Sequence, residues 1–103
     1  MKKYNKLIRD KIPEIIEKAG KDYEIKTLKG KKYLNSLNQK LQEELDEYLE
    51  DENVKELANL LEVIYAILDF KGVSRQELEK IRKNEKKNRG GFEKGLYLIQ
   101  AEE

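Results

Sequence analysis

The spacing of apolar residues predicts two long neighbouring helices in the middle of the chain. Between residues 32 and 50, apolar side chains recur every three or four positions, at Leu34, Leu37, Leu41, Leu45 and Tyr48. That spacing gathers them into one stripe along an α-helix. A second helix is expected over 54–70, where apolar residues are denser. Only residues 51–53 separate the two patterns, so the helices should pack as antiparallel neighbours.

A short helix is expected before this pair, within residues 9–21. Asp10 is placed to cap its start, Pro13 is tolerated in its first turn, and Gly20 stands where a helix commonly ends. Residues 22–30 follow as an extended connector or a short strand.

A fourth helix is expected after the pair. Ser74 and Glu77 have the spacing of a capping box, and the helix should run to about residue 88. A glycine-rich turn follows, and residues 96–103 suggest a short extended tail. The predicted fold class is therefore all-α: a small antiparallel helical bundle completed by oligomerisation, with a short extended C-terminal tail.

Composition narrows the possible functions. The 103 residues suit one domain spanning 1–103, and a chain this short buries so little surface that an oligomer is expected. With 22 basic and 21 acidic residues, the net charge of +1 argues against a nucleic-acid binder. The absence of Cys and His excludes zinc fingers, thiol nucleophiles and His bases, and leaves oxygen ligands for any metal.

The apolar runs and the N-terminus bear on location. No apolar run approaches the roughly 20 residues that a membrane-spanning helix needs. The N-terminal residues also lack the apolar core of a signal peptide. A cytoplasmic protein without membrane contact is therefore expected.

Acidic residues flank the apolar stripe of the helix expected over 32–50. On a helical wheel with Leu41 at zero, Glu44 falls about 60° to one side and Glu47 about 120° to the same side. Lys40 lies between them, whereas Glu43 falls on the opposite face and is expected in solvent. Glu44 and Glu47 are therefore predicted to be neighbours beside a buried surface.

The helix expected over 54–70 has two apolar strips. One contains Val54, Leu57, Leu61, Ile64 and Leu68, and the other contains Leu60, Val63 and Ile67. Two strips require two partners, so we expect the preceding helix to cover the first and a second subunit to cover the second, in a homodimer or homotetramer. Glu56 lies within the second strip, with Asn59 and then Glu62 successively further out.

Antiparallel packing can bring the Glu44 and Glu47 edge against the Glu56 and Asn59 edge. Carboxylates crowded on a partly apolar surface repel one another and lose solvation, unless a divalent cation lies between them. Mg²⁺, or Mn²⁺ in its place, suits such oxygen ligands. The alternative is an ordinary solvated acidic face, because Glu is common on exposed helix surfaces. The position of Glu56 within an apolar strip favours the metal site.

Four segments together resemble a known family. In order they are "YNKLIRDKIPEII", "KLQEELDEYLE", "KELANLLEVIYAI" and "RGGFEKGLYL". They resemble the MazG-like all-α nucleoside triphosphate pyrophosphohydrolases, in the small single-domain branch related to phosphoribosyl-ATP pyrophosphohydrolase. The resemblance covers nearly the whole chain. It implies Mg²⁺-dependent cleavage of a nucleotide between the α- and β-phosphates with release of pyrophosphate, in a house-cleaning role.

The resemblance also implies a set of metal ligands. The family motif Glu-Glu-x-x-Glu corresponds to "EELDE", in which Glu44 and Glu47 are the ligands, and one of these two is the expected general base. The motif Glu-x-x-Asp corresponds to "ELAN", so Glu56 matches while Asn59 replaces the family's Asp. An amide oxygen can bind a hard cation but brings no charge. Glu62, one turn further, is a possible additional ligand.

Cationic residues near these motifs are expected to bind the phosphates of the substrate. They are Lys6, Arg9, Lys11, Lys40, Lys86 and Arg89. Two alternatives to an active enzyme stay open. One is a relative that binds nucleotide with weak or no turnover because of Asn59, and the other is a dimeric helical interaction protein without chemistry.

Overall fold

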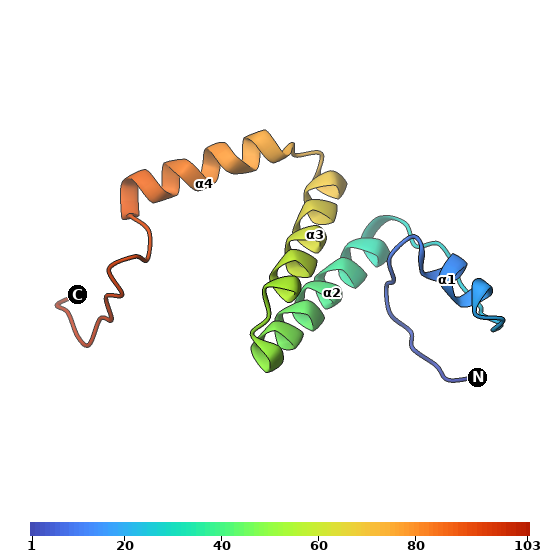
Figure 1. The fold of residues 1–103 in the computed structure, drawn as a ribbon. Coiled ribbons are helices and arrows are strands. Elements are labelled where there is room, and N and C mark those ends of the chain that lie inside the picture. The colour runs from blue at the N-terminus through green and yellow to red at the C-terminus, as the bar shows by residue number, and fades with distance from the viewer. The chain divides into compact units, whose positions relative to one another are not determined.

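The structure, a computed structural model, describes all 103 residues, and its secondary structure consists of helices without strands (Figure 1). Its helices are α1 (Ile12–Lys18), α2 (Gly30–Asp51), α3 (Val54–Lys71) and α4 (Arg75–Arg89). The all-α prediction is confirmed. Residues 21–29 form neither helix nor strand, so the alternative of a short strand between the first two helices is wrong.

Contacts along the chain define two units. The first is Met1–Gly72, which contains α1, α2 and α3, and the second is Val73–Glu103, which contains α4 and the C-terminal residues. The expectation of one domain over 1–103 stays a prediction. No helix in the structure is long and apolar enough to span a membrane.

The first unit is built on the α2–α3 hairpin, in which the two helices lie side by side (Figure 1). Glu52 and Asn53 make the turn. Glu52 takes a left-handed conformation with φ of 52°, and the Asn53 side chain caps α3 by accepting a hydrogen bond from the Lys55 amide at 2.8 Å. This short turn forces the antiparallel arrangement that the sequence predicted.

The hairpin core is small. Only Leu37, Val63 and Leu68 among the apolar side chains are buried. At the end of the hairpin away from the turn, Tyr33 and Phe70 meet edge to face, with ring centroids 5.8 Å apart. A core of this size leaves most apolar side chains of the two helices partly exposed.

Each of the two apolar strips of α3 is buried in part, which differs from the prediction that α2 covers one strip and leaves the other for a second subunit. Val63, from the strip expected to face a second subunit, is buried at 8% exposure, and Leu60 and Ile67 are half-buried. In the other strip, Leu68 is buried and Ile64 is half-buried, whereas Val54, Leu57 and Leu61 are 76%, 43% and 43% exposed. Both strips are apolar, so the pattern alone cannot decide which one rotates toward α2. In the part of α3 nearest the turn, the strip that contains Glu56 is the more covered of the two.

The start of α1 also differs from expectation. Lys11, not Asp10, is the N-cap residue, and no side chain caps the helix. The Ile12 amide instead donates to the Arg9 carbonyl at 3.1 Å, which places a turn where the Asp10 cap was expected. Gly20 follows the helix with φ of +72°, a conformation that glycine adopts readily, so the predicted stop is confirmed.

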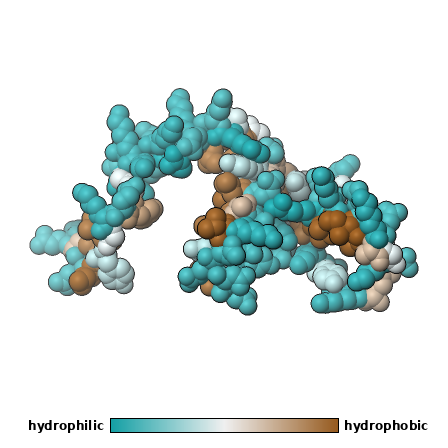
Figure 2. Space-filling view, viewed as in Figure 1, coloured by the Kyte–Doolittle hydropathy of each residue, from teal (hydrophilic) through white to brown (hydrophobic).

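In the second unit, α4 begins as predicted. The Ser74 hydroxyl accepts a hydrogen bond from the Glu77 amide at 3.1 Å, and the helix ends at Arg89 before Gly90. The helix has no buried residue, and residues 96–103 form neither helix nor strand. Figure 2 shows mostly hydrophilic surface over α4 and hydrophobic surface along α3.

Candidate functional site

Three carboxylates converge between α2 and α3. Glu44 and Glu47 lie one turn apart on the same edge of α2, and Glu56 lies in the first turn of α3. One carboxylate oxygen from each lies within 4.8 Å of the others. The convergence expected from the helical spacing and the antiparallel turn is therefore present in the structure.

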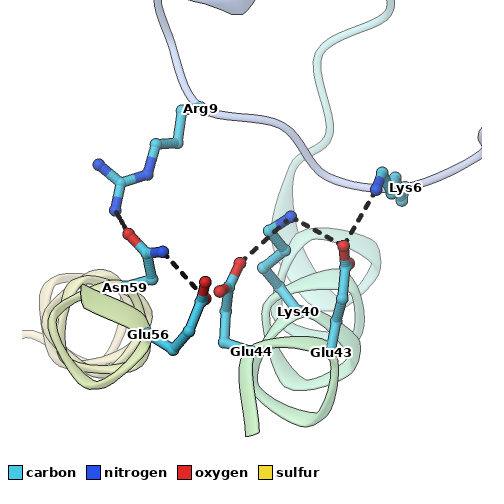
Figure 3. A network of polar contacts seen from close by, with 7 residues as sticks. All are labelled: Lys6, Arg9, Lys40, Glu43, Glu44, Glu56 and Asn59. Atoms are coloured by element: carbon cyan, nitrogen blue, oxygen red, sulfur yellow. Dashed lines mark hydrogen bonds and ion pairs between the residues drawn. The ribbon is translucent and has the colours of Figure 1, made fainter. Parts of the chain in front are cut away.

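Glu44 is the buried member of this group. It is 7% exposed, and it is the one charged residue that the fold buries. Its Oε1 lies 3.6 Å from the Lys40 Nζ, whereas its Oε2 is buried without any hydrogen-bond partner. A buried carboxylate oxygen without a partner destabilises the fold, because it has lost its hydrogen bonds to water and forms none with the protein. Figure 3 shows the Glu44 and Glu56 carboxylates pointing toward each other between the helices.

The charges in this group are not balanced. Burial raises the pKa of Glu47, and the negative charges of Glu44 and Glu56 beside it raise that pKa further. A group whose neighbours resist its ionisation is stabilised by a proton or by a cation. Three oxygen donors of this kind suit a hard divalent cation such as Mg²⁺ or Mn²⁺. The orphaned Glu44 oxygen shows that the residues present fit such an ion.

Glu43 is not in solvent as the helical wheel predicted. It is half-buried, and its Oε1 accepts hydrogen bonds from Lys6 at 3.0 Å and Lys40 at 3.3 Å. Burial alone would raise the pKa of Glu43, but the bonds and charges of the two lysines outweigh it and hold the pKa below its usual value. The wheel failed because it could not place the N-terminal segment, residues 1–11, across α2.

Asn59 lies at the edge of the carboxylate group and bridges two charged residues. The Arg9 guanidinium donates to the Asn59 Oδ1 at 3.0 Å, and the Asn59 Nδ2 donates to the Glu56 Oε2 at 3.2 Å (Figure 3). The side chain therefore offers its nitrogen, not its oxygen, to the carboxylates. Glu62, considered as an additional ligand, is exposed and lies outside the group of three.

The predicted phosphate-binding cations are divided between the two units. Lys6, Arg9 and Lys40 each contact the carboxylate group or a residue beside it. Lys11 is exposed at the start of α1 and is not among these contacts. In the second unit, Lys86 pairs with Glu93 at 3.7 Å and Arg89 pairs with Glu85 at 3.5 Å. The structure thus brings three of the six together around the carboxylates.

Two features of the site escaped the sequence pattern. They are the Lys6–Glu43 pair, separated by 37 residues, and the Arg9–Asn59 hydrogen bond, separated by 50 residues. Local periodicity carries no information on contacts between such distant segments. Their one trace in the sequence is that Lys6 and Arg9 are basic residues in a segment that precedes two acidic helices.

Comparisons of this chain with models of protein families, with curated proteins and with solved structures find no match.

Proposed function

We propose that the chain is a Mg²⁺-dependent nucleotide pyrophosphohydrolase of the MazG-like kind. In this reaction a nucleoside triphosphate is cleaved between its α- and β-phosphates, giving a nucleoside monophosphate and pyrophosphate. The observation that carries the proposal is the convergence of Glu44, Glu47 and Glu56 around a buried Glu44 oxygen that has no partner. The four sequence segments that resemble the family give independent support.

The roles of the carboxylates follow from their positions. Glu44, Glu47 and Glu56 would hold the ion, which when bound neutralises phosphate charge and lowers the pKa of a coordinated water. The chain has no His, so the proton of the attacking water must pass to a carboxylate. Glu44 and Glu47 are the two proposed candidates for this base, because both lie in the carboxylate group where the water would be held.

The substrate is proposed to be a small anionic nucleotide, in a house-cleaning role. Cleavage of a polyphosphate needs neutralisation of charge and positioning more than covalent chemistry. Lys6, Arg9 and Lys40 supply positive charge beside the carboxylates. Lys86 and Arg89 of the second unit, together with Lys11, remain proposed phosphate ligands on the basis of the resemblance. A cytoplasmic location stays a prediction.

A homodimer or homotetramer is proposed to complete the fold. The apolar strip that the hairpin leaves exposed runs through Val54, Leu57 and Leu61 of α3, and Leu49 near the end of α2 is also exposed at 62%. A hairpin with three buried apolar side chains is too small to be stable alone. Packing of this face against a second copy would form a four-helix arrangement with a larger core.

Asn59 favours a second candidate function, binding of a nucleotide without turnover. Its oxygen is taken up by Arg9, so the site has three carboxylates where the family motif supplies four. Fewer charged ligands weaken the hold on a hard cation. Binding of nucleotide in the absence of any pyrophosphate release would support this candidate over the enzyme.

The test of the enzyme is a panel of nucleoside triphosphates with Mg²⁺ or Mn²⁺, with pyrophosphate and orthophosphate measured separately. We expect release of pyrophosphate that stops when the metal is chelated, and that is lost in Glu44→Gln. The matched control is Glu79→Gln, which makes the same change on the exposed surface of α4. Steady release of orthophosphate from the triphosphates would contradict the proposal.

A further inference from the structure

Arg9 differs from the other cations beside the carboxylates in the charge of its partner. Lys6 pairs with Glu43, and Lys40 pairs with both Glu43 and Glu44. These two lysines are therefore already neutralised by carboxylates. Arg9 makes its side-chain hydrogen bond to Asn59, an uncharged amide. Its full positive charge remains available, and the residue is exposed to an approaching ligand.

Asn59 has the two functions that this arrangement needs. Its oxygen accepts from Arg9 at 3.0 Å, and its nitrogen donates to Glu56 at 3.2 Å. A side-chain amide can accept on one side and donate on the other without carrying charge. An ionised Asp at this position would have no donor for Glu56 and would pair with Arg9, which would compensate the charge of the guanidinium.

The position of Arg9 suits an anion bound at the carboxylate group. Figure 3 shows Arg9, Lys40 and Lys6 on the side of the carboxylates along which the N-terminal segment runs. A guanidinium presents its remaining N–H groups in a fork that matches the oxygens of a phosphate. Because Asn59 is also bonded to Glu56, the guanidinium is held at a fixed place relative to a proposed metal ligand.

We propose that Asn59 is a positioning residue that holds Arg9 beside the carboxylates with its charge uncompensated, so that Arg9 binds a phosphate group of the anionic ligand. The inference rests on the proposed function, because it takes the carboxylates as the place where a metal and a polyphosphate bind. It assigns Asn59 a role on the anion, whereas the family motif has a metal ligand at this position.

The test measures binding of inorganic pyrophosphate to the full chain by calorimetry at saturating Mn²⁺, with Mn²⁺ affinity measured separately by electron paramagnetic resonance. The variants are Asn59→Asp, Arg9→Ala and the double variant. Asn38→Asp, on the exposed surface of α2, is the matched control for the added charge. Asn59→Ala serves as a second variant that breaks both hydrogen bonds without adding charge, in case Asn59→Asp does not fold.

We expect Asn59→Asp to weaken pyrophosphate binding about tenfold, the value of one charge-assisted hydrogen bond. In the Arg9→Ala background the same change should cost only about two- to threefold, which is general repulsion across solvent. Asn59→Ala should likewise weaken binding in the native background and have little effect when Arg9 is absent. Asn38→Asp should leave the affinity unchanged.

The inference is overturned if Asn59→Asp has the same effect with and without Arg9, or if it tightens Mn²⁺ binding and leaves pyrophosphate affinity unchanged. The second result would place residue 59 among the metal ligands. Failure of the metal site on which the proposed function rests looks different, because the unmodified chain would then bind no Mn²⁺. That result would overturn both proposals together. If the unmodified chain binds Mn²⁺ but the effect of Asn59→Asp is the same with and without Arg9, only the positioning role is overturned.

Discussion

The α2–α3 hairpin and helix α4 are both rich in charged side chains, but they treat their acids in opposite ways. On α4, Glu79 pairs with Arg82 and Glu85 pairs with Arg89, each within one turn of the same helix. In the hairpin, carboxylates from two different helices converge to within 4.8 Å of one another. The α4 acids are neutralised by neighbours on the same helix, whereas the hairpin gathers three carboxylates with Lys40 paired to one of them, Glu44.

The pKa directions follow this difference. The hydrogen bond from Arg82 lowers the pKa of Glu79, whereas burial and neighbouring carboxylates raise the pKa of Glu47. Local pairs on an exposed helix contribute little and need nothing more. Converging carboxylates beside apolar residues are stable only with an external cation or with protons. The content of acidic residues therefore does not mark a candidate site, while their convergence on a buried surface does.

The largest expected effect is on pyrophosphate release, which should fall when an acid of the hairpin is replaced but not when an acid of α4 is replaced. Glu44→Gln should lower pyrophosphate release about 100-fold or more, because a bound metal supplies several kcal/mol of stabilisation to the transition state. Glu79→Gln on α4 should leave the rate unchanged, although the chemical change is identical. Initial rates at several Mg²⁺ concentrations measure both. Equal losses of pyrophosphate release in the two variants would mean that the hairpin carboxylates have no catalytic role that the α4 carboxylates lack.

The next prediction compares the apolar surfaces of the two regions. Leu57→Lys, on the exposed strip of α3, should raise the dissociation constant of the oligomer at least tenfold, roughly the cost of burying an unpaired charge. Ile81→Lys on α4, where Ile81 is 54% exposed, is the matched control and should have no effect. Light scattering across a dilution series gives the oligomeric state. A monomeric unmodified chain would contradict the expectation.

Local features of the fold could be read from the sequence. Apolar periodicity placed the central helices within two residues of Gly30–Asp51 and one of Val54–Lys71, and the Ser74 cap marked the start of α4. The convergence of Glu44, Glu47 and Glu56 also followed, because it depends on spacing along two helices and on a turn of two residues. Each of these rests on interactions between residues close in sequence.

Contacts between segments that are far apart in the chain could not be predicted from the sequence. Two apolar strips on α3 gave no basis for predicting which residues of each would be buried, and the structure buries Val63 of one and Leu68 of the other. Glu43 and Asn59 take their roles from Lys6 and Arg9, in a segment that α1 and the irregular residues 21–29 separate from the hairpin in sequence. The identity of Asn59 drew attention to that position, but its bond to Arg9 required the fold.

The third prediction uses the raised pKa of Glu47. A carboxyl group whose pKa is raised by folding favours the folded state below its unfolded value of 4.5, and this contribution is lost as the pH rises through the raised pKa. At pH 7 without metal, ionised Glu47 therefore destabilises the hairpin. Glu47→Gln should raise the melting temperature by about 2–5 °C at pH 7, with the gain vanishing toward pH 4.5.

Mg²⁺ should reverse this result. The ion stabilises the unmodified protein by binding the folded state, and the variant loses that gain. Thermal unfolding followed by circular dichroism, with Mg²⁺ and with a chelator, measures both effects. A metal-free Glu47→Gln protein that melts below the unmodified chain at pH 7 would show that the three carboxylates do not repel one another as their positions indicate.

The smallest expected effect concerns the ion pair that ties the N-terminal segment to α2. The pKa of Lys6 is raised by its hydrogen bond to Glu43 and by the charge of that residue, and the pKa of Glu43 is lowered, so both partners are stabilised in their charged forms. The contribution of the lowered Glu43 pKa is present above pH 4.5 and is lost as the pH falls through the lowered pKa.

The Lys6 side chain is 44% exposed, so solvent screens its pair with Glu43. Glu43→Gln should therefore lower the free energy of unfolding by no more than about 1 kcal/mol at low salt. In 1 M salt, where the Debye length is about 3 Å, that loss of stability should nearly disappear.

Glu79→Gln is again the control, because it breaks an ion pair within one helix and cannot release a distant segment. Hydrogen exchange over residues 1–11 distinguishes the two: it should speed up in Glu43→Gln and stay unchanged in Glu79→Gln. Unchanged exchange in both variants would mean that the Lys6–Glu43 pair does not hold the segment, and that the Arg9–Asn59 bond and the half-buried Leu7 and Ile8 are sufficient.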